Sequence, residues 1–356
     1  MSTLETNSIG KYSGNNVSID DALNLKSYTT AQRNALTSVA GDTIYNSDDN
    51  KPQYYDGSAW QNMGSGVITV DYLVVAGGGS GGSRIGAGGG AGGLRSTIGN
   101  TGGGGSLESS INVTAGSGIT VTIGAGGAAV TSNGAGIVGN NGSNSVFSTV
   151  TSVGGGGGGA YFNPTAGNGL SGGSGGGGAY ANGTGGSGTA NQGYAGGNYV
   201  SGIASAGGGG AGEVAPGTSV SQDGGDGVIC NILSSSDATT ESVGEVVSTN
   251  VYYAGGGGGS PSGTGGLGGA SNGTPGDNSN ASNADANTGG GGGGARNASD
   301  TTNVISGAGG SGVVILRYAD AFTISVGAGL TAGSTYTSGG YKVTPIKSGT
   351  GTVSWS

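Results

Sequence analysis

The sequence contains no histidine, one cysteine and six prolines, and only 8% of its residues are charged. Without histidine there can be no His-dependent catalytic triad and no His-ligated metal site. The single cysteine, Cys230, excludes an internal disulfide framework, and we expect it to be a small buried residue. The net charge of −9 argues against nucleic acid as a partner, because binding to phosphates requires a basic surface.

Long apolar segments are also missing. No run of about 18 apolar residues occurs, so no membrane insertion is expected. Residues Met1–Gly10 lack the apolar stretch of a secretory signal peptide, so we expect synthesis in a cytoplasm without export through that route.

Metal-binding motifs are not recognisable either. Four aspartates lie in polar segments, but their spacing fits no calcium-binding loop, so solvated turn residues are the simpler interpretation. These residues are Asp223, Asp226, Asp277 and Asp285. We therefore expect no metal and no cofactor.

What the sequence has in abundance is glycine. Glycine and proline (92 and 6) make up 98 of 356 residues without a strict period. Such a composition is typical of disordered chains, but the low charge favours order. Collagen needs glycine at every third position, and a P-loop needs Lys-Ser/Thr after its glycine turn; neither occurs. The longest runs are Gly154–Gly159, Gly175–Gly178, Gly207–Gly210, Gly255–Gly259 and Gly289–Gly294.

A dinucleotide-binding fingerprint is the one misleading motif. The apolar segment 72–76 leads into Gly77, Gly79 and Gly82, which satisfies G-x-G-x-x-G after an expected strand. The fingerprint also requires a helix at that turn and an acidic residue about 20 positions later. The following residues are glycine-rich and the next acidic residue is Glu108, so we reject this interpretation.

The remaining ordered arrangement is a bundle of extended polyglycine helices. Such a helix has three residues per turn and no internal hydrogen bonds, so its N–H and C=O groups must pair with neighbouring segments. Only glycine allows backbones to approach from all three sides, because a Cβ atom would block the contact. The glycines expected to be structural are Gly154, Gly157, Gly207, Gly255 and Gly289.

Residues 1–66 differ in composition and form a separate small module. Thr29 or Thr30 can cap a helix over Ala31–Ser38, and residues 42–62 predict a small β-meander with a turn at Asp56-Gly57. The module is too small to bury a convincing core alone, so we expect it to self-associate or to dock on a partner.

The stretch from Gly41 to Met63, Gly-Asp-Thr-Ile-Tyr-Asn-Ser-Asp-Asp-Asn-Lys-Pro-Gln-Tyr-Tyr-Asp-Gly-Ser-Ala-Trp-Gln-Asn-Met, resembles a module of tail-fibre and other structural proteins of marine bacteriophages. The resemblance implies a virion protein on the phage tail or particle surface, made in the host cytoplasm. It also implies a homotrimer formed through residues 1–66, which would attach to other virion or tail proteins.

Residues 67–318 are expected to form the glycine-rich domain. Strands are predicted over 67–76, 145–153 and 313–318, with a hairpin between 107–113 and 119–123. The segments Tyr72-Leu-Val-Val-Ala-Gly-Gly-Gly and Gly309-Gly-Ser-Gly-Val-Val-Ile-Leu-Arg-Tyr resemble glycine-rich phage adhesin domains, in which polyglycine helices pack as a layered sandwich. A related architecture occurs in some animal receptor ectodomains.

Residues 319–356 predict a small C-terminal β segment that either covers a sheet edge or forms a separate lobe. Together these patterns predict a mainly irregular and β fold. Its centre would be a polyglycine II helix sandwich flanked by short β-strands, with a small mixed N-terminal module.

Recognition is expected in the loops between glycine runs, because the packed glycines cannot vary. Tyrosines on a rigid scaffold can stack on sugar rings while asparagines donate hydrogen bonds; alternatively, the tyrosines seal the flanks of the glycine layers. The candidate receptor-binding residues are Tyr161, Phe162, Asn163, Tyr180, Asn182, Tyr194, Asn198 and Tyr199.

Four functional hypotheses stay open. The favoured one is a non-enzymatic tail-fibre or adhesin subunit that binds a bacterial surface glycan or outer-membrane protein. The second is a purely structural fibre or capsid-decoration subunit without receptor binding. The third, an ice-binding protein, requires a flat regular face, which the bulky loops argue against. The fourth, a glycan depolymerase, lacks a recognisable pair of catalytic carboxylates.

Overall fold

The computed structural model describes residues 24–63, 66–132, 135–161, 167–200, 205–216, 222–297 and 302–356. The chain divides into two compact units, Met1–Gly66 and Val67–Ser356. Most of the described chain is irregular, with short β-strands and two short α-helices. Among the described residues, no helix is long and apolar enough to cross a membrane.

The first unit contains one helix and a four-stranded sheet in the order β1-β2-β3-β4. Strand β1 is parallel to β2, and the other pairs are antiparallel. The meander predicted over residues 42–62 is therefore confirmed. The elements are β1 (Ser27–Tyr28), α1 (Thr30–Asn34), β2 (Thr43–Asn46), β3 (Lys51–Tyr55) and β4 (Trp60–Asn62).

Helix α1 is shorter than the sequence indicates. Thr29 caps it, because its hydroxyl accepts from the Gln32 N–H while the Gln32 side chain accepts from the Thr29 N–H. The helix ends at Asn34 and not at Ser38, and none of its residues is buried. A short helix without a buried face has little besides this cap to stabilise it.

The interior of the first unit is largely polar. Ile44 is the buried apolar side chain of its described part, at 5% exposure, whereas Asn46 and Gln53 are buried polar residues. The Asn46 side-chain amide donates to Gln53 Oε1 at 3.2 Å, and Arg33 donates to the same oxygen at 2.9 Å. This unit is therefore held by a hydrogen-bond network more than by apolar burial.

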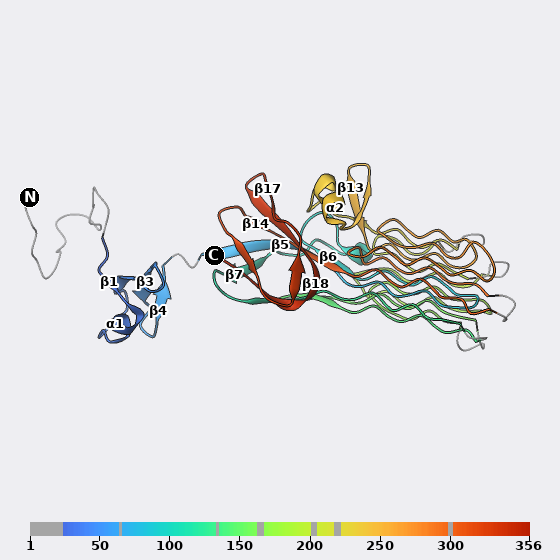
Figure 1. Ribbon diagram of the computed structural model, residues 1–356, viewed down its shortest axis with the longest axis horizontal. Coiled ribbons are helices and arrows are strands. Elements are labelled where there is room, and N and C mark those ends of the chain that lie inside the picture. The colour runs from blue at the N-terminus through green and yellow to red at the C-terminus, as the bar shows by residue number, and fades with distance from the viewer. Residues whose placement is uncertain are drawn as a thin grey trace, which may run out of the picture. The chain divides into compact units, whose positions relative to one another are not determined.

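An eleven-stranded sheet lies at one end of the second unit (Figure 1). Its main path is β10-β9-β8-β18-β14-β5-β6, with β7 on β5 and three strands on β18. The strands are β5 (Val67–Val75), β6 (Leu94–Ser96), β7 (Ile111–Thr114), β8 (Ile119–Thr122), β9 (Ser145–Phe147), β10 (Val150–Ser152), β14 (Val313–Ala319), β15 (Ile324–Val326), β16 (Leu330–Ala332), β17 (Tyr336–Ser338) and β18 (Tyr341–Trp355).

The two ends of this path approach each other, so the sheet is nearly closed. The Ser152 hydroxyl at the end of β10 donates to the Val74 carbonyl on β5 at 2.8 Å. The Gly93 N–H, directly before β6, donates to the Val153 carbonyl at 2.8 Å. These bonds leave little of the β10 edge unpaired.

The second half of strand β5, Tyr72–Val75, is buried on both faces. Leu73 and Val75 belong to one apolar cluster with Leu94 and Tyr253. The alternate residues of the strand lie on the opposite face, as the period of two requires, and join a second cluster around Phe147. The sheet thus has an apolar layer on each side at its centre.

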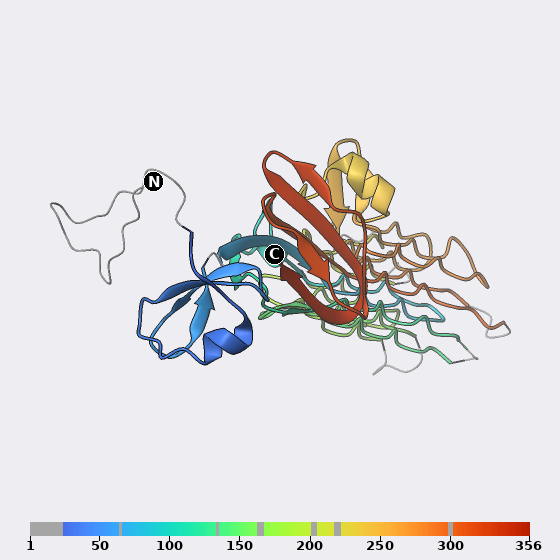
Figure 2. The same ribbon diagram turned by 60° about the vertical axis from the view of Figure 1, so that its left-hand side comes forward.

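The C-terminal residues are part of this sheet. Strand β18 pairs with β14 through Tyr341–Ile346 and with β8 through Thr350–Val353, so it lies between them. Figure 2 shows β18 as one long curved strand. The segment 319–356 therefore completes the sheet of the second unit and is not a separate lobe.

Two local predictions are wrong. Strands β7 and β8 do not form a hairpin, because β7 pairs with β5 while β8 pairs with β9 and β18. The predicted strand over 145–153 is two strands that pair with each other, β9 and β10. The chain reverses at Ser148, whose φ of 55° lies in the left-handed region.

An insertion between the glycine runs was not predicted. It contains a three-stranded sheet of order β11-β13-β12 and a capped helix beside the glycine segments (Figure 2). Its buried residues include Cys230 and Tyr253, so the prediction of a buried cysteine is confirmed. The elements are β11 (Val228–Ile229), α2 (Ser235–Glu241), β12 (Glu245–Val247) and β13 (Asn250–Tyr253).

The glycine runs form extended segments beyond the sheet, and each central segment bonds to three neighbours in turn. In segment 86–93, three N–H groups donate to segment 289–295, three to segment 153–159 and two to segment 205–212, at 2.7–3.0 Å. The partner therefore repeats every three residues. The donor–acceptor pairs are Gly86–Ala295, Gly89–Gly292 and Gly92–Gly289; Ala87–Gly159, Gly90–Gly156 and Gly93–Val153; and Gly88–Ala206 and Ala91–Gly209.

The glycines named as structural have no room for a side chain. A Cβ atom on four of them would overlap a backbone carbonyl oxygen of an adjacent segment, and one on Gly289 would overlap the Val75 side chain. Gly289 also has a φ of 73°. The four carbonyl contacts are Gly154 with Gly142, Gly157 with Gly139, Gly207 with Asp223 and Gly255 with Gly266.

Candidate functional site

The turns that join the glycine segments lie at the end of the second unit away from the sheet (Figure 1). Arg84 is the ninth residue after β5 ends at Val75, and Tyr161 is the ninth after β10 ends at Ser152. At about 3.1 Å per residue, both are carried about 28 Å from their strands. Segments of equal length therefore bring these two side chains to the same level.

Three tyrosines and one arginine meet at this end, and we call them the tip cluster: Arg84, Tyr161, Tyr180 and Tyr199. The ring centroids of Tyr161 and Tyr180 are 4.9 Å apart at 87°, and those of Tyr180 and Tyr199 are 5.5 Å apart at 78°. The Arg84 guanidinium lies 5.1 Å from the Tyr161 ring. Edge-to-face contacts of this kind fix the rings relative to one another.

The tip cluster is open to solvent at its centre. The Tyr180 side chain is 40% exposed, while the rings on either side of it are half-buried. Tyr180 enters a turn in which Ala181 and Asn182 have φ values of 68° and 71°. Asn182 is exposed and follows Tyr180 by two residues in the same turn.

The predicted site residues thus divide into three groups. Tyr161, Tyr180 and Tyr199 are brought together, and Asn182 is exposed in the turn that follows Tyr180. Phe162 and Asn163 lie outside the described residues.

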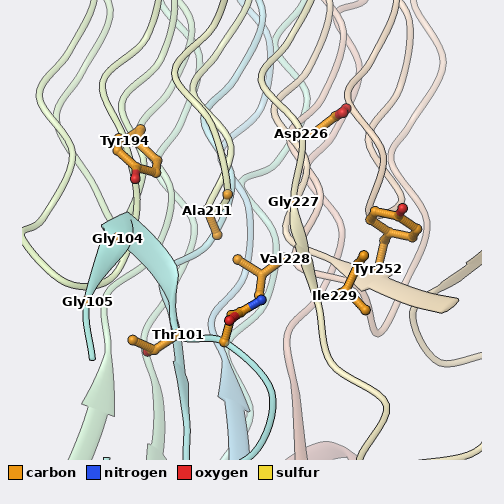
Figure 3. Close-up of a pocket in the computed structure, with 12 residues that line it drawn as sticks. Thr101, Gly104, Gly105, Tyr194, Ala211, Asp226, Gly227, Val228, Ile229 and Tyr252 are labelled. Atoms are coloured by element: carbon orange, nitrogen blue, oxygen red, sulfur yellow. The ribbon is translucent and has the colours of Figure 1, made fainter. Parts of the chain in front are cut away.

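The third group consists of Asn198 and Tyr194, whose side chains have other surroundings. The Asn198 Oδ1 accepts a hydrogen bond from the Gly185 N–H at 2.8 Å, so this side chain pairs a backbone group at the edge of the glycine segments. Tyr194 lines a groove where the glycine segments meet the strands (Figure 3).

The role of Asn198 is shared by other exposed asparagines. In each case the side-chain oxygen accepts from a backbone N–H of an adjacent segment, which satisfies a donor that has no further segment beside it. These residues are Asn141, Asn144, Asn168, Asn272, Asn280 and Asn283.

Arg84 was not among the predicted site residues. A signal was present, since the chain has only ten lysines and arginines and Arg84 is separated by one residue, Ser83, from the glycines that precede it. Arg296 occupies the same kind of position after Gly289–Gly294, and its guanidinium pairs with Asp277. Ile85 forms an isolated β-bridge with Arg296, so the two arginine turns are neighbours.

The tip cluster has the chemistry of a binding surface. It presents aromatic faces, phenol groups and a guanidinium on a rigid support, which suits stacking on apolar ring faces and hydrogen bonding to hydroxyls. Within the described parts of the chain, no group of three or more Cys, Asp and Glu residues is placed to hold a metal ion.

The sequence matches the glycine-rich domain family over residues 56–319, most of the chain. The protein therefore belongs to the glycine-rich domain family. Neither the curated proteins nor the solved structures gave a match.

Proposed function

We propose that the protein is a virion adhesin or tail-fibre subunit that binds a receptor on the host cell surface, a glycan or an outer-membrane protein, through the tip cluster. The observation that carries the proposal is the contact of Tyr161, Tyr180 and Tyr199 at the end of the glycine segments. These rings come from three different segments of the chain, so no single loop accounts for their meeting. A rigid aromatic surface binds at low entropic cost, because the rings are already held in place.

The second part of the proposal is that the glycine segments are polyglycine II helices packed as a sandwich. Two observations support it: the hydrogen-bond partner of segment 86–93 repeats every three residues, and a Cβ atom at the central glycines would overlap neighbouring backbone. Such packing gives the turns a support that does not depend on an apolar core.

The third part concerns residues 1–66, which we propose form a homotrimer that attaches to other virion proteins. The described part of this unit buries one apolar side chain, Ile44, and exposes Val39, Tyr54 and Met63 at 66%, 40% and 44%. So little apolar burial stabilises a unit of this size poorly, and contacts with partner subunits would supply the missing area.

Binding of the labelled full-length protein to a panel of bacteria tests the receptor-binding proposal. We expect Tyr180→Ala to reduce binding to a responsive strain by at least about tenfold, because it removes the central exposed ring. Tyr341→Ala is the matched control, because Tyr341 is 41% exposed and lies on β18. Equal loss in both variants, or binding that survives both, would favour a purely structural fibre or capsid-decoration subunit.

A further inference from the structure

A groove of about 490 Å³ lies at the opposite end of the glycine segments from the tip cluster, where they meet the strands (Figure 3). Its walls come from the loop around Thr101 and Gly104, from the glycine segments at Tyr194 and Ala211, and from β11 and β13. The volume lies within the range of about 300–1,000 Å³ that is usual for small-molecule sites.

Two tyrosines mark the ends of the groove. Figure 3 shows Tyr194 and Tyr252 on opposite sides, with the Val228 side chain between them. Both tyrosines are half-buried, and neither hydroxyl has a hydrogen-bond partner among the described residues. An elongated ligand can therefore contact an aromatic ring at each end and an apolar surface in the middle.

The polar groups of the groove favour a neutral ligand rich in hydroxyl groups. Asp226 is the charged residue among those that line it, and its Oδ1 accepts from the Leu267 N–H at 2.8 Å. Its other oxygen can accept from a ligand hydroxyl, whereas an anion would be repelled. The exposed Asn100 amide supplies both a donor and an acceptor.

The walls are held in place by backbone bonds that do not involve these side chains. The Gly103 N–H donates to the Ala211 carbonyl at 2.8 Å, and the Gly212 N–H donates to the Asp226 carbonyl at 3.0 Å. Ile229 on β11 pairs with Tyr252 on β13. A ligand thus meets a groove that is already formed, which lowers the entropic cost of binding.

We propose that this groove binds a neutral oligosaccharide, with one sugar ring against Tyr194, another against Tyr252, and hydroxyls paired with Asp226 and Asn100. The alternation of apolar ring faces and polar edges in such a chain matches the alternation along the groove. The proposal does not depend on receptor binding at the tip cluster, which uses different residues.

Ligand-observed NMR titration of the full-length protein tests the proposal, with maltotriose, cellotriose and triacetylchitotriose as neutral probes and trigalacturonic acid as the anionic probe. We expect at least one neutral trisaccharide to bind. Affinity should fall by about tenfold or more in Tyr194→Ala and in Tyr252→Ala, because each loses a stacking surface. The anionic probe should bind more weakly than the neutral ones.

Further variants keep the test decisive if an alanine variant misfolds. Tyr194→Phe and Tyr252→Phe retain the rings and should lose affinity by a smaller factor, while Asp226→Asn retains an acceptor for Leu267 and should weaken binding. Tyr341→Ala, at an exposed position on β18 and outside the groove, should leave trisaccharide binding unchanged. Binding of the anionic probe alone, equal binding by all groove variants, or no binding of any neutral probe would overturn the proposal.

Discussion

The two ends of the second unit are stabilised in different ways, one by side-chain packing and the other by backbone hydrogen bonds. At the sheet, side chains such as Leu73, Phe147 and Leu316 form apolar layers on both faces. In the glycine segments there are few side chains to bury, and the backbone N–H groups of an interior segment such as 86–93 instead pair with three neighbouring segments. The sheet therefore depends on the shape and volume of its side chains, whereas the glycine segments depend on their absence.

This difference predicts opposite responses to substitution. A buried leucine can lose atoms and leave a cavity, and its neighbours adjust in part. A buried glycine between three neighbouring backbones can only gain atoms, and the groups that these atoms would strike are carbonyls already fixed by hydrogen bonds. One added methyl group should therefore cost more in the glycine segments than several removed from the sheet.

The largest expected effect is that of Gly157→Ala. Its Cβ atom would overlap the Gly139 carbonyl oxygen, so we expect the free energy of unfolding to fall by more than about 3 kcal/mol, and Gly157→Val to prevent folding of this unit. Denaturant unfolding measures the change. Gly276→Ala is the matched control, because a Cβ atom there meets nothing within 4 Å and the change should stay within about 0.5 kcal/mol.

If Gly157→Ala and Gly276→Ala unfold at the same denaturant concentration, the close packing of backbones is not what holds the glycine segments. The contrast with the sheet would then be lost, and with it the support for a polyglycine II sandwich.

The next effect is that of Leu316→Ala in the sheet. Leu316 is fully buried in the cluster that contains Phe147 and Trp355, so removal of its side chain should cost about 2–4 kcal/mol. Leu316→Met keeps most of the volume and should cost less than about 1.5 kcal/mol. Denaturant unfolding of both variants checks whether volume governs this end; equal losses in Met and Ala variants would contradict it.

A third, smaller effect concerns the contact that joins the insertion to the sheet. Glu241 on α2 is 7% exposed and accepts from Lys347 Nζ at 2.8 Å, from the Tyr336 hydroxyl at 2.9 Å and from the Ser334 N–H at 2.8 Å. Burial raises the pKa of the Glu241 carboxyl, but the bonds from Lys347, Ser334 and Tyr336 together outweigh it and lower the pKa to about 2.

Because the folded state holds this carboxylate ionised, its stabilisation is complete above pH 4.5, the usual pKa, and is lost as the pH falls towards about 2. We expect Glu241→Gln to lower stability at pH 7 by about 1–2 kcal/mol after solvent screening, and to reduce the loss of stability between pH 4.5 and pH 2. Urea unfolding at several pH values measures both. Glu213→Gln, at an exposed position, should leave the pH profile unchanged; an identical profile for all three proteins would rule out this role of Glu241.

The sequence predicts the sheet better than the arrangement of the glycine segments. Apolar patterns identify β5 and β14, because side chains of alternating character reveal a strand and its buried faces. Glycine runs carry no such pattern. Nothing in the sequence tells whether segment 86–93 or segment 289–295 will lie beside a given third glycine segment. Which glycine segments become neighbours depends on how the turns connect them. This depends on the path of the whole chain and not on the sequence of any one segment.

The candidate site shows the same limit. Tyr194 and Tyr199 are five residues apart and were both predicted as receptor-binding residues. In an extended segment five residues span about 15 Å, so one ring reaches the tip cluster while the other lines the groove. Tyr161 and Tyr180 are far apart in the sequence and meet because their segments end at the same level. The sequence therefore predicted that tyrosines form the candidate site, but not which tyrosines lie together.

The smallest expected effect lies at the edge of the glycine segments, where the two modes of stabilisation meet. Asn198 accepts from the Gly185 N–H and so replaces a missing neighbouring segment with a side chain. Because both groups are near solvent, water can partly replace the bond, and Asn198→Ala should cost no more than about 1 kcal/mol. Asn198→Asp retains an acceptor oxygen and should cost less.

Hydrogen exchange separates this role from receptor binding. In Asn198→Ala the Gly185 amide should exchange faster, while the Gly89 amide, which donates to Gly292 in the interior, should keep its wild-type rate. Binding to bacteria should not change, since the amide is engaged with the protein. Unaltered exchange at Gly185 together with reduced binding would instead place Asn198 at the receptor interface. The asparagines at the edge of the glycine segments would then be recognition residues and not substitutes for a neighbouring backbone.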